Sequence, residues 1–268
     1  MALEFPNINP VALDLGIVQI HWYALAYVVG FITAWRLAIY LCQLDGGTSA
    51  RPNKDDIDDY MTWAILGVLL GGRIGYVLFY NLPTYLDNPT EALKIWHGGM
   101  SFHGGVIGVV LSLILFSKFK QVPFWRLADI AAAVTPIGFF LGRIANFING
   151  ELYGRVTDVS WGVIFPRGGE EPRHPSQIYQ ALTEGLLLFI ILFILIRIKS
   201  VRIRAGVVSA CFMIGYGIFR FACEFYREPD VQLGFIVQQV TMGQILCIPM
   251  IIAGLAIFYV AGRNARKT

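Results

Sequence analysis

The residues of this sequence with the clearest capacity for chemistry follow directly after an apolar run. LADIAAAVTPIGFFL leads into GRIANFINGELYGR, residues 142–155, where Arg143, Asn146 and Glu151 come together. A helix that only needs to end can do so with one Gly and one Lys. A cation, amides and a carboxylate at this point indicate a binding function instead.

A second polar cluster is RFACEFYREPD, residues 220–230. Arg220 and Glu224 are spaced i, i+4, and Glu224 and Arg227 are spaced i, i+3, so all three share one helix face. Glu224 can neutralise and orient both arginines and leave their other donors for a ligand. A purely structural ladder of ion pairs is the alternative interpretation.

His103 lies between glycines in GGMSFHGGVIG, residues 98–108. The flanking glycines predict an imidazole accessible from several directions, and imidazoles titrate near neutral pH, as a general base must. A hydrogen-bonded membrane histidine is the alternative. The four histidines are far apart, and no HExxH, GxSxG or pair of intramembrane aspartates occurs, which disfavours a metal site, a serine hydrolase and an aspartyl protease.

The composition places these residues in a membrane protein. Of 268 residues, 56% are hydrophobic and only 15% are charged, against about 25% charged in soluble domains. Apolar runs near 20 residues are long enough to cross the hydrocarbon core. The four cysteines indicate small buried residues, and the N-terminus, which lacks a basic region, is not expected to be a cleaved signal peptide.

The chain is therefore expected to be an all-α integral membrane protein with seven transmembrane helices in a single domain over residues 1–268. Strand-like residues among Gly and Pro in 148–176 predict a small extracytoplasmic cap of short strands and turns between segments 4 and 5. The acidic loop LDGGTSARPNKDDIDDY is expected to be solvated and to cap a helix. The seven apolar segments are 18–42, 61–80, 100–117, 127–147, 177–197, 206–223 and 238–261.

Lys and Arg lie mainly in the loops after the first, third, fifth and seventh segments. Those loops should face the cytoplasm, so the N-terminus is expected outside and the C-terminus inside. Arg36 falls near the cytoplasmic end of its segment and can reach the interface by itself. Other polar residues within the segments then fall in one layer near the outer headgroups: Tyr23, Arg73, His103, Arg143, Glu184, Arg220 and Gln244.

This layer predicts an anionic ligand at the level of the outer headgroups. Arginine within the membrane costs at least about 2.5 kcal/mol, so it usually faces a polar cavity or partner. Guanidinium groups match phosphate oxygens two hydrogen bonds at a time. An anionic phospholipid is the simplest such ligand.

The sequence also resembles a known family, the bacterial phosphatidylglycerol–prolipoprotein diacylglyceryl transferases. The resemblance covers nearly the whole chain, and GRIANFINGELYGR together with HGG is its most specific part. It rests on HWYALAY (21–27), GGRIGYVLFY (71–80), GGMSFHGGVIG (98–108), GRIANFINGELYGR (142–155), HPSQIYQA (174–181), RFACEFYREPD (220–230) and TMGQ (241–244).

The resemblance implies a seven-span enzyme of the bacterial cytoplasmic (inner) membrane with its active site facing the periplasmic leaflet. It implies transfer of diacylglyceryl from phosphatidylglycerol, a membrane lipid, to the lipobox cysteine thiol of a prolipoprotein signal peptide, with release of glycerol phosphate. No cofactor, metal or nucleic acid is expected, and the protein is expected to act as a monomer. The family's important residues fall on Tyr23, His103, Arg143, Asn146, Glu151, Gly154, Arg220, Glu224 and Arg227.

For this reaction we expect Arg143 and Arg220 to bind the phosphate and Asn146 the headgroup hydroxyls. Glu224 would orient Arg220 and Arg227, and His103 would accept the thiol proton. Further substrate-binding residues are expected at Tyr23, Arg73, Glu151 and Gly154. Whether Glu151 meets Arg143 or Arg155 is open at this stage.

Three other functions are weighed against this one. A lipid flippase or anion transporter should carry polar residues through both leaflets, whereas the inner half here is nearly all hydrocarbon. A structural or receptor-like membrane protein should place its distinctive residues in loops or small-residue seams. A transferase that uses the same lipid with another acceptor is the nearest rival, because the residues alone do not identify the acceptor.

Overall fold

The long apolar runs form helices, because only internal backbone hydrogen bonds can satisfy the chain within hydrocarbon. The structure is a computed structural model that describes residues 2–6, 8–17, 19–45, 50–94, 96, 98–229, 235–237 and 240–264. Residues 46–49 of the acidic loop and 238–239 of the last predicted segment lie outside it. The long helices are α1 (Trp22–Cys42), α2 (Lys54–Phe79), α4 (Phe102–Lys120), α5 (Phe124–Ile148), the continuous α6 (Ser176–Gln180), η4 (Ala181–Leu187) and α7 (Leu188–Arg197), then α9 (Val207–Cys223) and α10 (Met242–Asn264).

Within the described residues, six of these helices are long and apolar enough to cross a membrane. The prediction of a multi-pass, mainly helical membrane protein is therefore confirmed. The sixth predicted segment, 206–223, corresponds to α9, an apolar helix that is shorter than the other six. The predicted segment 100–117 extends at its end, to Lys120, and not into the loop before it.

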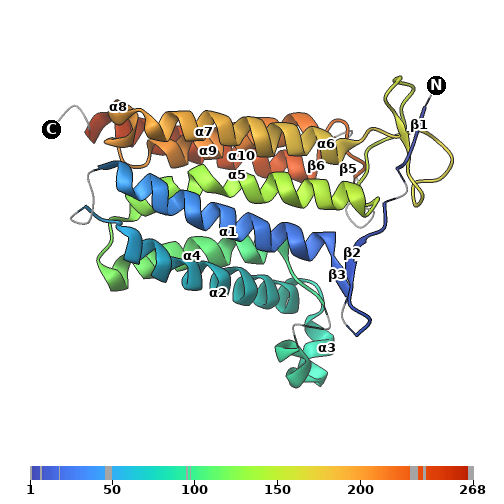
Figure 1. The fold of residues 1–268 in the computed structure, drawn as a ribbon, viewed down its shortest axis with the longest axis horizontal. Coiled ribbons are helices and arrows are strands. Elements are labelled where there is room, and N and C mark those ends of the chain that lie inside the picture. Colours follow the sequence, from blue (N-terminus) through green and yellow to red (C-terminus); the bar gives the residue numbers. More distant parts are fainter. Residues whose placement is uncertain are drawn as a thin grey trace. The chain divides into compact units, whose positions relative to one another are not determined.

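The chain divides into two compact units by its internal packing. Unit 1 comprises Met1–Leu37 and Asp129–Thr268, and unit 2 comprises Ala38–Ala128. Figure 1 shows the elements of both units. The predicted single domain over residues 1–268 stays a prediction.

Unit 2 is built on a glycine seam between α2 and α4. A Cβ atom placed on Gly71 would lie 2.4 Å from the carbonyl oxygen of Gly104, and one on Gly108 would lie 1.9 Å from that of Gly67. The two helix backbones therefore touch, as small residues allow in membranes. Of the glycines that flank His103 in the sequence, Gly104 lies in this seam and serves helix packing.

The start of α2 confirms the capping role predicted for the acidic loop. The Asn53 side chain accepts from the Asp56 amide, and the Asp56 carboxylate accepts from the Asn53 amide, a reciprocal capping box. Asp56 also binds the Arg51 guanidinium. Because Asp56 is buried, this part of the loop is not the solvated connection that we expected.

In unit 1, α9 packs against α7 and α10, and Asp129 of α5 accepts hydrogen bonds from the amides of Gly206 and Ser209 at the start of α9. The short helix α8 (Lys199–Arg202) lies at the opposite end of this unit from β1 (Leu3–Glu4), as Figure 1 shows. The remaining strands are β2 (Val11–Asp14), β3 (Gln19–His21), β4 (Val163–Ile164), β5 (Phe235–Val237) and β6 (Val240–Thr241).

The segment 148–176 consists of turns, isolated β-bridges and the strand β4. β4 pairs in parallel with β1, and Arg173 forms bridges to Val156 and Val163. The predicted content of short strands and turns is present, and the position of this segment outside the cytoplasm stays a prediction.

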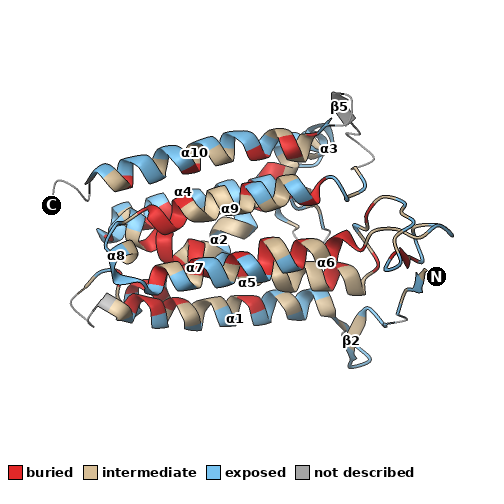
Figure 2. Cartoon of the chain, turned by 90° about the horizontal axis from the view of Figure 1, so that it is seen from above, coloured by how far each residue is buried: buried red, intermediate tan, exposed pale blue. Residues whose placement is uncertain are grey.

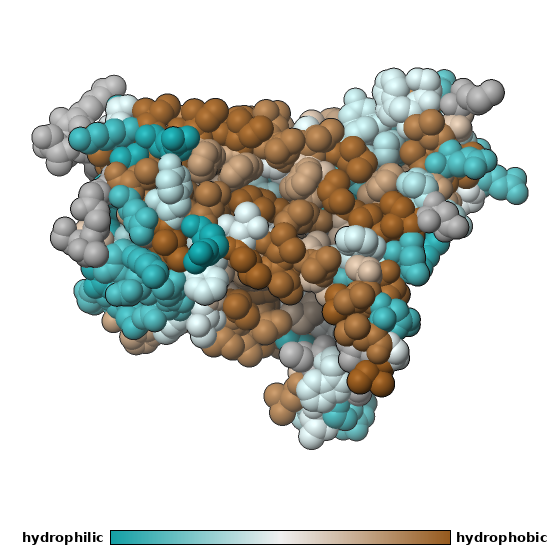
Figure 3. Space-filling view, viewed as in Figure 1, coloured by the Kyte–Doolittle hydropathy of each residue, from teal (hydrophilic) through white to brown (hydrophobic). Residues whose placement is uncertain are grey.

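The outer surfaces of the long helices are apolar, as Figure 3 shows by the brown side chains along them. In α7 and the helix before it, exposed leucines and isoleucines recur at Leu182, Leu186, Ile190 and Ile194. Such faces suit contact with acyl chains. All four cysteines are free, and all except Cys211 are buried, in agreement with the sequence analysis.

Candidate active site

The end of α5 forms the first part of the site. Arg143 Nη1 lies 3.5 Å from Asn146 Oδ1, and Asn146 Nδ2 donates to Glu151 Oε1 at 2.9 Å. Asn149 Nδ2 also donates to Glu151 Oε1, at 3.3 Å. Asn146 therefore links Arg143 to Glu151, which answers in part the question of what Glu151 contacts.

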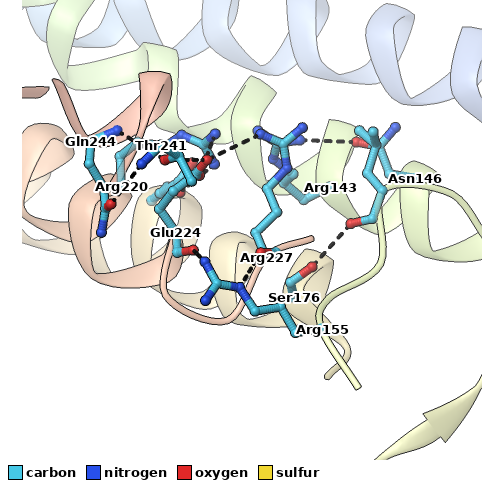
Figure 4. Close-up of polar contacts among 11 residues, drawn as sticks. Arg143, Asn146, Arg155, Ser176, Arg220, Glu224, Arg227, Thr241 and Gln244 are labelled. Atoms are coloured by element: carbon cyan, nitrogen blue, oxygen red, sulfur yellow. Dashed lines mark hydrogen bonds and ion pairs between the residues drawn. The ribbon is translucent and has the colours of Figure 1, made fainter. Parts of the chain in front are cut away.

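The end of α9 forms the second part, where the i, i+4 spacing brings Arg220 and Glu224 together (Figure 4). The prediction that Arg227 shares this helix face is wrong, because α9 ends at Cys223 and Arg227 lies after it, in a β-bridge with Gly154. Arg220 Nη2 lies 2.8 Å from Glu224 Oε2, and Arg227 Nη1 lies 3.8 Å from Glu224 Oε1. Thr241 Oγ1 donates to Glu224 Oε1 at 3.0 Å. The Glu224 side chain is 4% exposed, so its ion pair with Arg220 lies inside the protein.

Gly243, at the start of α10, makes room for this carboxylate. A Cβ atom at Gly243 would lie 2.8 Å from Glu224 Oε1. The motif TMGQ thus contributes Thr241 as a donor and Gly243 as a close contact. Gln244 lies behind them, and its Oε1 accepts from the Thr241 amide at 3.2 Å.

A third part comes from η4, and the sequence analysis did not include it among the site residues. The Glu184 carboxylate is 1% exposed, and its Oε1 lies 3.8 Å from Arg220 Nη1. The charges of Arg143 and Arg227 also act on it. The available signal was a single carboxylate in the apolar run ALTEGLLLF, at the predicted level of the outer headgroups.

Gly154 holds the segment after α9 in place through its backbone. Its amide donates to the His174 carbonyl at 2.8 Å, and a Cβ atom there would lie 2.4 Å from the Tyr226 carbonyl oxygen. The next residue, Arg155, donates from Nε to the Arg227 carbonyl at 3.0 Å. Gly154 therefore positions the backbone of Arg227.

Tyr23 belongs to the same unit. It lies in the first turn of α1, and its hydroxyl is 3.2 Å from that of Tyr27. The charges of Glu151 and Arg143 both act on the Tyr23 phenol. Unit 1 thus brings together eight predicted site residues: Tyr23, Arg143, Asn146, Glu151, Gly154, Arg220, Glu224 and Arg227.

The other two predicted residues, Arg73 and His103, belong to unit 2. Arg73 is 5% exposed. Its guanidinium donates to backbone carbonyls of η2 (Pro89–Leu93) and of the residues that follow it. The guanidinium also lies 5.2 Å from the ring centroid of Tyr85, in α3 (Leu82–Asp87). The carbonyls belong to Glu91, Ala92, Lys94, Gly98 and Gly99.

His103 lies in the first turn of α4 and is exposed. The Ser101 hydroxyl caps this helix by accepting from the Gly104 amide at 3.1 Å. The Ser101 amide donates to the Gly72 carbonyl at 2.8 Å, which ties the start of α4 to α2.

The cluster in unit 1 combines three guanidinium groups with three carboxylates, and some of its donors are not used. Arg220 Nη1 is buried without a hydrogen-bond partner, and so is the whole amide of Gln180, one turn before Glu184. Buried polar atoms are rarely left unpaired in proteins. A cationic donor of this kind suits a phosphate oxygen. Among the described residues, no group of His, Cys, Asp and Glu side chains could hold a metal ion.

These helices define a multi-pass membrane protein, with a cluster of largely buried arginines and carboxylates at the ends of α5 and α9. A family model described as prolipoprotein diacylglyceryl transferase matches residues 10–260. The chain belongs to that family, as the resemblance in its motifs predicted.

Individual relatives agree with this assignment, and each bears the name phosphatidylglycerol–prolipoprotein diacylglyceryl transferase. The chain is 55% identical to the protein of Azospirillum brasilense over 95% of its own length and 94% of the relative's. It is 48% identical to that of Paramagnetospirillum magneticum, covering 99% and 98%. For Rhodospirillum rubrum the identity is 49%, covering 98% and 95%.

Proposed function

We propose that this protein transfers the sn-1,2-diacylglyceryl group from phosphatidylglycerol to the lipobox cysteine thiol of a prolipoprotein. The product is a thioether, glycerol phosphate is released, and the reaction is the first step of lipoprotein maturation. The observation that carries the proposal is Arg220, held by Glu224 on one side and with Nη1 unbonded on the other. The family and its named relatives supply the identity of the substrates.

In the reaction, a bond forms between the cysteine sulfur and the glyceryl carbon next to the phosphate. The bond from that carbon to the phosphate oxygen breaks, and the electron pair leaves with the phosphate. Arg143 and Arg220 stabilise the charge that develops there, because preorganised donors act more strongly in a site without water. Asn146 binds the headgroup hydroxyls while Glu151 fixes the Asn146 amide.

The thiol must lose its proton before it can attack, since the thiolate is the nucleophile. His103 accepts this proton. Tyr23, Arg227 and Gly154 shape the binding site: Tyr23 lies within the field of Arg143, and Gly154 fixes the Arg227 backbone. Arg73 has no substrate oxygen to bind in this scheme, because its donors are used by carbonyls.

In the membrane, α9 forms the seventh span beside the six longer helices. The N-terminus lies outside and the C-terminus in the cytoplasm, so the ends of α5 and α9 fall at the outer, periplasmic leaflet of the bacterial inner membrane. Residues 148–176 then form the extracytoplasmic cap. The protein acts as a monomer, with all its reacting groups in one chain.

The test is mass spectrometry of a lipobox-cysteine peptide incubated with the purified protein and phosphatidylglycerol. We expect a mass gain of one diacylglyceryl unit on the cysteine. The gain should be absent with a Cys→Ser peptide and with Arg143→Ala. No gain from the folded, lipid-loaded protein would exclude this acceptor and leave a transferase with another acceptor as the next hypothesis.

A separate experiment tests the base. His103→Gln should lower the rate and remove the limb of the pH profile that depends on deprotonation of the imidazole. If this variant keeps both its rate and a normal pH profile, His103 is not the base.

A further inference from the structure

The helix formed by α6, η4 and α7 keeps one side buried over its whole length (Figure 2). One row of its fully buried residues is spaced by four, at Gln180, Glu184, Leu188, Leu192 and Ile196, and Gln177 and Ala181 are buried beside it. In an α-helix, a spacing of four drifts by about 40° at each step, so this stripe would turn away from the core. The π-helix η4 has wider turns and offsets part of the drift.

The π-helix thus directs the Glu184 carboxylate toward the protein interior, next to the buried apolar residues of α7. Its Gly185 packs so tightly on α5 that a Cβ atom there would lie 2.7 Å from Phe140 Cα. Single π-helical turns inside α-helices are frequent at functional sites. Glu184 is therefore held at the site by the backbone, beside Arg220.

The two carboxylates beside Arg220 play different parts. Glu224 Oε2 lies 2.8 Å from Arg220 Nη2, and the Thr241 hydroxyl donates to the other oxygen of the same carboxylate. Glu184 lies at 3.8 Å, and neither Glu184 Oε1 nor Arg220 Nη1 has a hydrogen-bond partner. Glu184 therefore adds charge without setting orientation. Between buried groups, such a charge acts strongly.

The reaction makes this charge useful. The phosphodiester that enters carries one negative charge, whereas the phosphate monoester that leaves carries about 1.5 to 2 at neutral pH. A cluster of three arginines would hold the more anionic product more tightly than the substrate. A fixed carboxylate 3.8 Å from Arg220 opposes this preference.

We propose that Glu184 is a positioning residue for the charge of the site, which weakens binding of the glycerol phosphate product and so speeds its release. The inference rests on the transferase function proposed above. It gives Glu184 a role in the charge of the site, whereas Glu224 orients Arg220.

The test is product inhibition of Glu184→Gln by glycerol phosphate in the peptide assay. The amide keeps the shape of the side chain and removes the charge. We expect the inhibition constant to fall about tenfold, which corresponds to about 1.4 kcal/mol, with kcat and KM for the lipid both reduced. Glu171→Gln, the same change at an exposed position in 148–176, is the control and should behave as wild type.

Glu184→Met removes the charge without adding an amide and should tighten inhibition in the same way if Glu184→Gln does not fold. Glu184→Asp, which keeps the charge, should return inhibition toward the wild-type value. Unchanged or weaker inhibition in the charge-free variants would overturn the inference while wild-type transfer stands. Absence of diacylglyceryl transfer by the wild type would instead overturn the proposed function.

Discussion

Arg73 in unit 2 and Arg220 in unit 1 are both arginines inside apolar helices, yet their surroundings differ. Arg73 donates to neutral carbonyls and lies against the Tyr85 ring. Arg220 faces two carboxylates and keeps Nη1 without a hydrogen-bond partner. The first arrangement uses the guanidinium to fold a loop, and the second prepares it for an anion.

The difference separates two reasons for an arginine in the membrane that look alike in sequence. Carbonyls accept hydrogen bonds from the donors of Arg73 but carry no charge, so its positive charge interacts with several carbonyl dipoles of the loop. Carboxylates neutralise the charge of Arg220 and orient its guanidinium through a small number of side chains. Only the second kind can exchange a partner for a phosphate without unfolding its surroundings.

The largest effect is expected from a substitution that removes the planar guanidinium of Arg220, with its paired donors, and keeps the positive charge. Arg220→Lys should lower kcat by about 100-fold or more, because an ammonium cannot bind Glu224 and a phosphate in the same plane. The steady-state peptide assay measures this, with folding checked by thermal unfolding in detergent. A lysine variant that turns over like the wild type would mean that only charge matters here, and the contrast with Arg73 would lose its basis.

Arg73→Ala should instead affect stability. It leaves carbonyls of residues 91–99 without their donor inside the protein, and each unsatisfied buried group costs about 1–3 kcal/mol. We expect a lower Tm and faster proteolysis within residues 81–100, with nearly normal turnover per folded molecule. A normal Tm with a raised KM for the lipid would favour the substrate-binding role that the sequence analysis gave to Arg73.

Gly154→Ala tests whether unit 1 depends on exact backbone placement as well as on charge. The added methyl group would meet the carbonyls of Tyr226 and His174, and the backbone that holds Arg227 must shift. We expect about tenfold lower activity and about 1–3 kcal/mol lower stability. Gly142→Ala is the matched control, because nothing lies within 4 Å of a Cβ atom there; equal behaviour of the two would contradict the positioning role.

The helices and the Arg220–Glu224 pair could be predicted because both follow from local spacing. Arg227 was expected on the same helix face, but α9 ends at Cys223 and Arg227 pairs with Gly154 in a bridge. Apolar runs must be helical in hydrocarbon, and i, i+4 neighbours meet on any helix. The same holds for the capping box at Asn53 and Asp56, which needs only four consecutive residues.

The partners of Arg73 and Glu184 could not be predicted in the same way. Arg73 binds carbonyls 18 to 26 residues away, and carbonyls leave no mark on the sequence. Glu184 reaches Arg220 because its helix widens into a π-helix, which no residue type announces. The contact of Gly104 with α2 could not be predicted either, because the sequence does not show which helix passes it.

The smallest predicted effect concerns His174. Its backbone and its side chain contact two different parts of the structure that positions Arg227. Its carbonyl accepts from Gly154, and its Nδ1 lies 3.1 Å from the Tyr179 hydroxyl. Burial lowers the pKa of His174, and the nearby Asp158 opposes this only in part. As the pH falls below about 6.5, the unfolded chain takes up a proton before the folded protein does.

Stability should therefore fall as the pH decreases below about 6.5, down to the lowered pKa of the folded protein, and Tm should drop by a few degrees. His174→Asn should flatten this part of the pH dependence, and Arg220→Lys should leave it in place. Thermal unfolding between pH 5 and pH 8 measures both. A drop of equal size in His174→Asn would show that the acid sensitivity does not come from His174.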